Sequence, residues 1–412
     1  MRVSDPTLVI EGGTLVEPFE PPVADGAVLI EGGEVAFSGP RRELPARARG
    51  LPRLDAAGGY IVPGFVDIHV HGGGGADTMD ASPDGLRAMT RAHASAGTTA
   101  LLCTTVTAPQ EALLAAERAV VEAARRQRAW WASGGPGGDG EAWGARIAGI
   151  HLEGPYLNPE RKGAQNPDYM RDPRLDELQA LLDASRLDGQ PLLRLMTIAP
   201  EREGALEAIR WLVGRGVAVA LGHSAVDGER LEAAIRAGAT QVTHLFNGMP
   251  PFHHRTPGLA GAALADDRLV AQLIADGVHI HPTALKVAYR ARGARGLALV
   301  TDALAPMGLG EGRFRLGEYE VEVRGGACRM LDGTLAGSIQ GLGDLVRRMA
   351  TEVGAPLPDA VAMASRVPAD AVGLGGRAGT LRPGAWGDAV VLDPRSLQVR
   401  ATVVGGRVVF RA

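Results

Sequence analysis

The sequence is poor in cysteine and lysine, and both shortages limit what the protein can do. Its 412 residues include two cysteines, Cys103 and Cys328, too few for the disulfide framework of a small secreted protein. We therefore expect reduced cysteines and a cytoplasmic location. Lys162 and Lys286 are the only lysines among 43 basic residues, which nearly excludes an active site built on lysine.

Segments typical of membrane, secreted and nucleic-acid-binding proteins are also missing. No apolar run approaches the roughly 20 residues that span a bilayer. Residues 1–11 lack a basic segment followed by an apolar one, so no secretory signal is expected. The 43 basic residues face 47 acidic ones, a net charge of −4, which leaves no basic excess for nucleic acid. We expect neither a membrane nor a nucleic-acid partner.

Both ends of the chain show short β-type runs separated by glycine pairs. The runs are 7–10, 27–31 and 35–38 near the start, and 389–392 and 399–404 near the end. Gly405-Gly406, between Val404 and Val408, is typical of a hairpin. We predict one small β-sandwich domain, built from residues 1–60 and 378–412.

Between these ends, eight continuously apolar runs alternate with helical patterns. Such strands indicate a parallel sheet covered by helices, and eight units predict an α/β protein with a (β/α)8 TIM-like barrel over residues 61–377. A doubly wound sheet is the alternative, but no G-x-G-x-x-G follows the first run. The runs are Ile61–Val70, Thr98–Val106, Ala148–Leu152, Leu193–Ile198, Val217–Leu221, Gln241–Leu245, Val270–Ile274 and Leu297–Val300.

Helices and two insertions complete the predicted barrel. We expect a glycine-rich surface insertion at Ser133–Gly140 and a hairpin at Arg313–Leu335, after the eighth strand. The expected helices are Pro83–Ala96, Glu111–Arg128, Leu175–Ala184, Gly204–Arg215, Gly228–Ala237 and Thr283–Arg290.

Histidines and carboxylates stand at or near the ends of several predicted strands. The ends of barrel strands line the active site of this fold, so these side chains should meet at one mouth. His69 and His71, two apart on a strand, point to the same face. Imidazole and carboxylate together suit zinc, iron or manganese. The set is His69, His71, Glu153, His223, His244 and Asp302.

Each histidine alone has a simpler interpretation, as a structural or merely polar residue. We interpret His93, on a predicted helix, in this way, and His151 as a packing or supporting residue. His253 and His254 lie in a predicted loop and could be solvated. Six coincidences at strand ends are improbable, so the set as a whole favours a metal site.

The six candidate ligands also indicate a type of reaction. A metal held there polarises a carbonyl group and lowers the pKa of bound water toward about 7. Asp302, at the last strand, is placed to take the water's proton and return it to the leaving group. The residues therefore predict hydrolysis of an amide-like bond.

At this point the sequence resembles the amidohydrolase superfamily, and more closely its N-acetylglucosamine-6-phosphate deacetylase family. The resemblance covers nearly the whole chain. Its most specific stretches are HLEGPYLN (His151–Asn158), GHSA (Gly222–Ala225), THLFNGMP (Thr243–Pro250) and DGVH (Asp276–His279). It implies hydrolysis of the N-acetyl group of N-acetylglucosamine 6-phosphate to glucosamine 6-phosphate and acetate, in amino-sugar catabolism and cell-wall recycling.

The resemblance also implies roles for the candidate metal ligands. Glu153, His223 and His244 match the ligands of the metal that all members retain. His69 and His71 match the pair that holds a second metal in binuclear members. Glu153 would then bridge both ions, where many relatives use a carboxylated lysine. Asp302 matches the general acid/base and a ligand of the second metal. One or two divalent ions are implied, with zinc expected and iron, manganese and cobalt as alternatives.

Substrate contacts follow from the resemblance as well. Asn247, Gly248, Arg255 and His279 match the residues that meet the sugar phosphate. The family's arginine reaches in from a neighbouring subunit, so a homodimer is implied, with Arg255 crossing between subunits. Gln165 stands where some members place a histidine that assists the acyl carbonyl; glutamine can donate a hydrogen bond there but cannot carry a proton.

Two other interpretations remain open. The protein could be another amidohydrolase, acting on an epimeric N-acetylhexosamine phosphate, a cyclic amide or an N-acyl amino acid. It could also be a non-catalytic barrel that assembles with partners, although every ligand position is filled. Whether hydrolysis requires the phosphate of the substrate tests the first alternative. Failure of the purified protein to bind added zinc or iron would favour the second.

Overall fold

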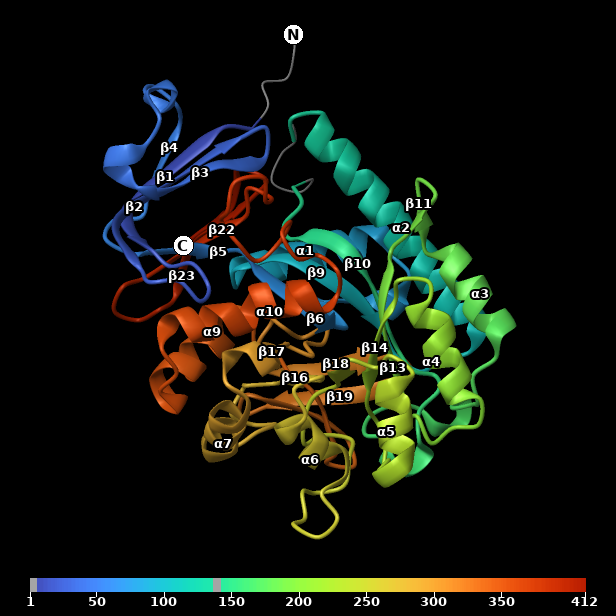
Figure 1. Ribbon diagram of the computed structural model, residues 1–412. Coiled ribbons are helices and arrows are strands. Elements are labelled where there is room, and N and C mark those ends of the chain that lie inside the picture. The colour runs from blue at the N-terminus through green and yellow to red at the C-terminus, as the bar shows by residue number, and fades with distance from the viewer. Residues whose placement is uncertain (1–5, 136–141) are drawn as a thin grey trace.

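The computed structural model describes residues 6–135 and 142–412. Its centre is a parallel eight-stranded sheet that curves into a barrel (Figure 1). An isolated parallel bridge between Val70 and Ala303 joins the first strand to the segment after the last one. This confirms the predicted (β/α)8 barrel. In spatial order the strands are β17 (Leu297–Leu299), β16 (Val270–Leu273), β15 (Gln241–Val242), β14 (Ala218–Leu221), β13 (Leu193–Ile198), β10 (Arg146–Glu153), β9 (Thr98–Thr105) and β6 (Phe65–Val70).

Helices surround the barrel, and their apolar sides form its outer core. α1 begins as its sequence dictates: the Ser82 side chain accepts a hydrogen bond from the Gly85 N–H, and Pro83 takes the first helical position. All six predicted helices are present. The helices are α1 (Pro83–Ser95), α2 (Gln110–Ala132), α3 (Leu175–Ala184), α4 (Ala205–Val213), α5 (Gly228–Arg236), α6 (Gly258–Ala265), α7 (Pro282–Arg292), α8 (Leu342–Arg348), α9 (Leu357–Ala364) and α10 (Arg366–Ala371), with a π-helical turn, η7 (Met349–Val353), after α8.

The two ends of the chain share a second sheet beside the barrel, which confirms the predicted β-sandwich of both termini (Figure 1). Side chains from both ends, such as Ile10, Val28, Val391 and Val403, pack in one core cluster. The strand order is β24 (Arg407–Arg411), β23 (Val399–Val404), β22 (Ala389–Leu392), β5 (Tyr60–Pro63), β1 (Leu8–Leu15), β2 (Val23–Glu31) and β3 (Glu34–Pro40), and β4 (Arg53–Asp55) pairs with β1.

The prediction of a single strand over Ile61–Val70 is wrong. β5 pairs with β22 of the terminal sheet, whereas β6 begins the barrel at Phe65. Gly64 separates the two strands, and a Cβ atom there would lie 2.1 Å from Thr99 Oγ1. The chain therefore passes from one sheet to the other at a residue without a side chain. The domain boundaries at 60/61 and 377/378 stay predictions.

The predicted hairpin after the last barrel strand is a larger unit, a four-stranded antiparallel sheet that we call the insert. Residues 136–140 of the predicted glycine-rich insertion lie outside the described residues. Within the described ranges, no helix has the length and apolar character needed to cross a bilayer. The insert strands are β18 (Gly312–Leu316), β19 (Tyr319–Arg324), β20 (Ala327–Met330) and β21 (Leu335–Gly337). Short elements are β7 (Gly72–Gly73), β8 (Ala76–Asp77), β11 (Arg186–Leu187), β12 (Gln190–Pro191) and the 3-10 turns η1 (Arg41–Glu43), η2 (Ala46–Ala48), η3 (Thr78–Asp80), η4 (Pro159–Arg161), η5 (Pro167–Tyr169) and η6 (Ala294–Gly296).

Candidate metal centre

The six candidate ligands lie on or just after five barrel strands, with His69 and His71 on the first, and they meet at the carboxyl end of the barrel. They form two groups whose ligand atoms lie within 4.8 Å of one another: Glu153 with His223 and His244, and His69 with His71 and Asp302. All six side chains are buried. The structure therefore places together every residue that the sequence predicted as a ligand.

Three of these residues lie just beyond their strands in an unusual backbone conformation. His223, His244 and Asp302 have φ angles of 46°, 28° and 49°. Left-handed backbone at a residue with a side chain costs about 1–3 kcal/mol and is held by its surroundings. The strain turns each side chain into the barrel mouth, and such outliers cluster at functional sites.

The first group is centred on one oxygen of Glu153. His223 Nε2 and His244 Nε2 each lie 3.2 Å from Glu153 Oε1, and the two nitrogens are 3.1 Å apart. The three donor atoms thus form a compact triangle at the ends of β10, β14 and β15.

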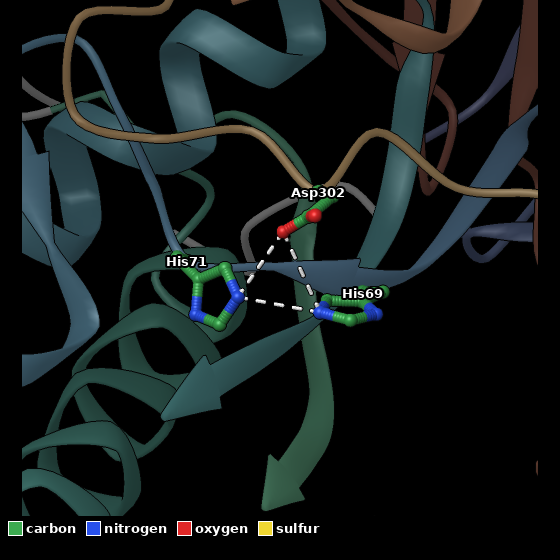
Figure 2. Close-up of side chains that lie close together, drawn as sticks. All are labelled: His69, His71 and Asp302. Atoms are coloured by element: carbon green, nitrogen blue, oxygen red, sulfur yellow. Dashed lines mark hydrogen bonds and ion pairs between the residues drawn. The ribbon is translucent and has the colours of Figure 1, made fainter. Parts of the chain in front are cut away.

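The second group is formed by the first and last strands of the barrel. Figure 2 shows both imidazole rings directed at the Asp302 carboxylate. Oδ1 of Asp302 lies 3.2 Å from His71 Nε2 and 3.5 Å from His69 Nε2. Glu153 reaches this group too, with Oε1 3.4 Å from His69 Nε2 and Oε2 3.3 Å from His71 Nε2. Glu153 therefore joins the two groups.

The protonation pattern shows that a cation fits between these atoms. His223 Nδ1 donates to the Arg161 carbonyl at 2.7 Å, and His244 Nδ1 donates to the Asn247 carbonyl at 3.1 Å. A neutral imidazole that donates through Nδ1 carries its lone pair on Nε2. Two lone pairs and the Glu153 carboxylate then point at the same place. Such a donor set repels itself unless a cation lies within it, and it suits zinc or a similar ion.

The charges of the group agree with this interpretation. Burial opposes ionisation of Glu153, but the charge of the neighbouring His69 is the largest opposing effect, and the pKa of Glu153 lies well below its usual range. Burial also opposes ionisation of Asp302, and His69 and His71 outweigh it and lower the pKa of Asp302. Burial lowers the pKa of His244, which keeps this ring neutral. Two carboxylates are therefore available as anionic ligands.

Sequence reasoning missed the residues that hold the ligands in place. Glu201, just after β13, accepts hydrogen bonds from Asn158 Nδ2 at 2.8 Å, Ser224 Oγ at 2.6 Å and the Ala225 N–H at 2.8 Å. It thereby connects the loop after Glu153 to the loop that carries His223. Its only sequence signal was its place after the fourth strand, whose end had no predicted function.

Two other histidines have structural contacts. His151 is buried between Thr197 Oγ1, at 2.9 Å from its Nε2, and the His69 ring, at a centroid distance of 4.7 Å. Burial lowers the pKa of His151 well below its usual value. His93 on α1 contacts the Gly72 carbonyl oxygen at 2.9 Å through Nε2. Both contacts agree with the interpretation of His93 and His151 as structural or supporting residues.

A cavity of about 190 Å³, which we call the catalytic cavity, opens over the two groups. Among its lining residues are Gln165, Asn247, Gly248 and His279, four of the five predicted substrate contacts. His279 is fixed by Asp276, whose Oδ2 lies 2.7 Å from His279 Nδ1. Part of the wall comes from the insert, at Leu316 and residues 334–336, which the sequence did not indicate.

Arg255 is the fifth predicted contact, and it lies elsewhere. It is exposed in the loop between β15 and α6, which projects from the barrel (Figure 1). Its Nη1 lies 3.0 Å from His254 Nε2. Among the described residues that line the catalytic cavity of this chain, Arg255 is not included.

The side-chain amide of Gln165, which was predicted to donate a hydrogen bond to the acyl carbonyl, already has protein partners. Its Nε2 donates to Glu153 Oε2 at 2.5 Å, and its Oε1 accepts from the Thr107 N–H at 2.7 Å. Both ends of the amide are therefore held, and the donating end is already directed at the ligand that joins the two groups.

Comparisons with known proteins give consistent relatives. The amidohydrolase family matches residues 60–409. N-acetylglucosamine-6-phosphate deacetylase of Vibrio furnissii is 39% identical, over 85% of this chain and 83% of its own length. N-acetylgalactosamine-6-phosphate deacetylase of Escherichia coli O157:H7 is 40% identical, over 81% of this chain and 83% of its own. The crystal structure of N-acetyl-D-glucosamine-6-phosphate deacetylase from Mycobacterium smegmatis has a TM-score of 0.85 at 37% identity, covering 98% of this chain and 100% of that one.

Proposed function

The chain belongs to the amidohydrolase family, and from this premise we propose that it hydrolyses N-acetylglucosamine 6-phosphate to glucosamine 6-phosphate and acetate. The observation that carries the proposal is the pair of ligand groups joined by Glu153 beneath the catalytic cavity. Relatives at 39% and 40% identity act on N-acetylhexosamine 6-phosphates. A linear amide on a sugar phosphate is therefore the proposed substrate.

Glu153, His223 and His244 would hold one divalent ion, and His69, His71 and Asp302 would hold a second. A bound ion supplies Lewis-acid activation of the carbonyl group and a water of lowered pKa. Zinc is the expected ion because imidazole and carboxylate donors suit it, with iron, manganese and cobalt as alternatives. The enclosed, anionic donor set supports this assignment.

Asp302 is the proposed general acid/base. It is ionised, since His69 and His71 lower its pKa, and it is 8% exposed, toward the catalytic cavity. Asp302 can therefore take a proton from the attacking water and deliver it to the amide nitrogen as the carbon–nitrogen bond breaks. Gln165 would donate to the acyl carbonyl once its hydrogen bond to Glu153 is released.

Asn247, Gly248 and His279 are the proposed phosphate contacts within this chain. Gly248 has a φ of 61°, and a Cβ atom there would lie 3.0 Å from His223 Nδ1. A residue with a side chain would crowd a candidate ligand, whereas glycine leaves the main chain accessible to an anion. We propose that Arg255 completes the phosphate site from the partner subunit of a homodimer, because it is exposed and outside its own cavity. The cytoplasm stays the expected location.

Acetate release by metal-reconstituted protein tests the proposal. N-acetylglucosamine 6-phosphate should be hydrolysed, and unphosphorylated N-acetylglucosamine should not. N-acetylgalactosamine 6-phosphate is the second candidate substrate, because a 40% identical relative is named for it. The ratio of kcat/KM for the two phosphates assigns the epimer. No release from any of the three sugars by metal-loaded protein would overturn the proposal.

A further inference from the structure

A second cavity lies against the catalytic cavity, and the proposed reaction as stated does not use it. We call it the side chamber; its volume is about 230 Å³, against about 190 Å³ for the catalytic cavity. The two share four lining residues: Val106, Ala164, Gln165 and Leu316. The proposed phosphate contacts line only the catalytic cavity. The side chamber therefore adjoins a part of the site that the phosphate does not occupy.

The wall between the two cavities is mainly apolar. Val106, Ala164 and Leu316 belong to one hydrophobic cluster. Gln165 is the one polar member of the four, and its two hydrogen bonds fix it beside Glu153. An apolar group at this boundary would therefore meet three hydrophobic side chains rather than the ligands.

The geometry of an amide determines which part of the substrate faces this wall. The scissile carbonyl must lie next to Asp302 and the ligand groups, and the phosphate must reach Asn247, Gly248 and His279. A secondary amide is planar and trans, so its acyl tail extends away from the carbon that carries the nitrogen. The acyl tail therefore points away from the sugar, toward the part of the site that holds no phosphate contact.

We propose that the side chamber receives neutral N-acyl tails longer than acetyl, so that the enzyme also deacylates N-propanoyl and N-butanoyl hexosamine 6-phosphates. This inference rests on the proposed function. The reaction is the same hydrolysis: the water oxygen bonds to the acyl carbon, the carbon–nitrogen bond breaks, and a proton goes to the nitrogen. The products are the amino sugar phosphate and a longer carboxylic acid.

Two carboxylates in the side chamber define the tails that fit. Asp80 and Glu318 both line it. Asp80 accepts the Asp77 N–H at 2.8 Å, and Glu318 accepts the Tyr169 hydroxyl at 3.1 Å. A tail that ends in a carboxylate would meet like charge there, whereas a tail that ends in a methyl group would not. An N-succinyl group should therefore be excluded and an N-butanoyl group of the same carbon count accepted.

The experiment compares kcat/KM for N-acetyl, N-butanoyl and N-succinyl glucosamine 6-phosphate with metal-loaded enzyme. Burial of one methylene changes kcat/KM by about fourfold, and N-butanoyl carries two methylenes more than N-acetyl, so the two values should lie within about twentyfold of each other. N-succinyl should be at least tenfold slower than N-butanoyl. Butanoyl hydrolysis more than a hundredfold slower than acetyl, or equal rates for butanoyl and succinyl, would overturn the inference.

A variant and a matched control on the same helix locate the effect. Ala112 on α2 lines only the side chamber, and Ala115, one turn further on, is exposed. Ala112→Phe should fill the side chamber and lower kcat/KM for N-butanoyl at least tenfold while leaving N-acetyl unchanged; Ala115→Phe should change neither. An unchanged butanoyl-to-acetyl ratio in folded Ala112→Phe would overturn the inference.

The outcomes for this inference and for the proposed function are separate. If Ala112→Phe does not fold, the butanoyl-to-succinyl ratio of the unaltered enzyme decides. Hydrolysis of the N-acetyl substrate alone would overturn the side-chamber inference and leave the proposed function standing. No hydrolysis of the N-acetyl substrate would overturn the proposed function and the inference with it.

Discussion

At the residue scale, Asp302 combines two proposed roles that a conservative substitution can separate. Asp302→Asn keeps the shape of the side chain but cannot accept the proton of the attacking water. We expect kcat to fall by about 10²–10⁴-fold, the usual contribution of a general acid/base. Metal at the Glu153 group should remain, because Asp302 belongs to the other group. Steady-state kinetics with elemental analysis of the purified variant measures both.

The control for this substitution is Asp344→Asn, a carboxylate at the start of α8 outside the ligand groups. It should leave kcat and metal content unchanged. A near-normal rate in Asp302→Asn would refute the assigned role.

Glu201 tests how far the ligands depend on their supports. Glu201→Ala removes the three hydrogen bonds that Glu201 accepts from the loops after β10 and β14. Loss of a group that orients a metal ligand typically weakens metal affinity by about 10–100-fold. We expect a higher Kd for zinc, measured by chelator competition, with partial rescue in Glu201→Gln.

The neighbouring Glu203 offers a matched control, since its side chain is exposed and the contact it makes, to Asp172, is through its main-chain N–H. Glu203→Ala should bind zinc as the unaltered protein does. Equal zinc affinity in Glu201→Ala and Glu203→Ala would show that the loops keep their positions without Glu201.

At the scale of the elements, the barrel strands could be predicted because burial on both faces makes them continuously apolar. The same signal failed at Ile61–Val70, where two strands of different sheets follow one another across Gly64. It also missed α6, which consists of glycine, alanine and leucine and has no polar face to give a helical period. The pattern of apolar residues along the sequence shows which residues are buried, but not which sheet or helix they pack against.

The ligands could be predicted for a related reason: each lies at or just beyond a strand end, and strand ends of a barrel converge. Glu201, Leu316 and Ala336 could not, because their roles depend on loops and on an insert whose position is set by tertiary packing. The left-handed conformations of His223, His244 and Asp302 were equally invisible, since nothing in those residue types requires a positive φ.

α2 carries a buried carboxylate whose ionisation should reduce stability. Glu117 is fully buried, and neither carboxylate oxygen has a hydrogen-bond partner among the described residues. Burial raises the pKa of Glu117 well above its usual value. A carboxyl whose pKa is raised by folding stabilises the fold below its unfolded pKa of about 4.3, and this stability is lost as the pH rises toward the folded pKa.

Glu117→Gln, which stays neutral, should therefore be more stable than the unaltered protein at pH 8 and similar to it at pH 4. A difference of about 2–4 °C in Tm is expected at pH 8. Thermal unfolding across this pH range measures it, with the exposed Glu111→Gln on the same helix as the control. A Tm difference that does not grow with pH would contradict the assignment.

At the scale of the whole molecule, the loop that carries Arg255 has no role in the catalytic cavity of its own chain. Residues 251–257 are exposed, and Phe252 keeps 53% of its surface accessible. An aromatic side chain beside an arginine on a projecting loop is typical of a protein interface. A closed twofold dimer would apply the same contact twice, and each loop would reach the other subunit's site.

Mixing two inactive variants tests this arrangement. In Asp302→Asn both sites lack the general base, and in Arg255→Glu both sites lack the partner's phosphate contact. If Arg255 acts across the interface, a mixed dimer contains one site with an intact Asp302 and an intact Arg255 from the other subunit. Random reassociation of equal amounts makes half of the dimers mixed, so about one quarter of the unaltered activity should return. If Arg255 served its own subunit, each site of the mixed dimer would still lack one group, and no activity would return.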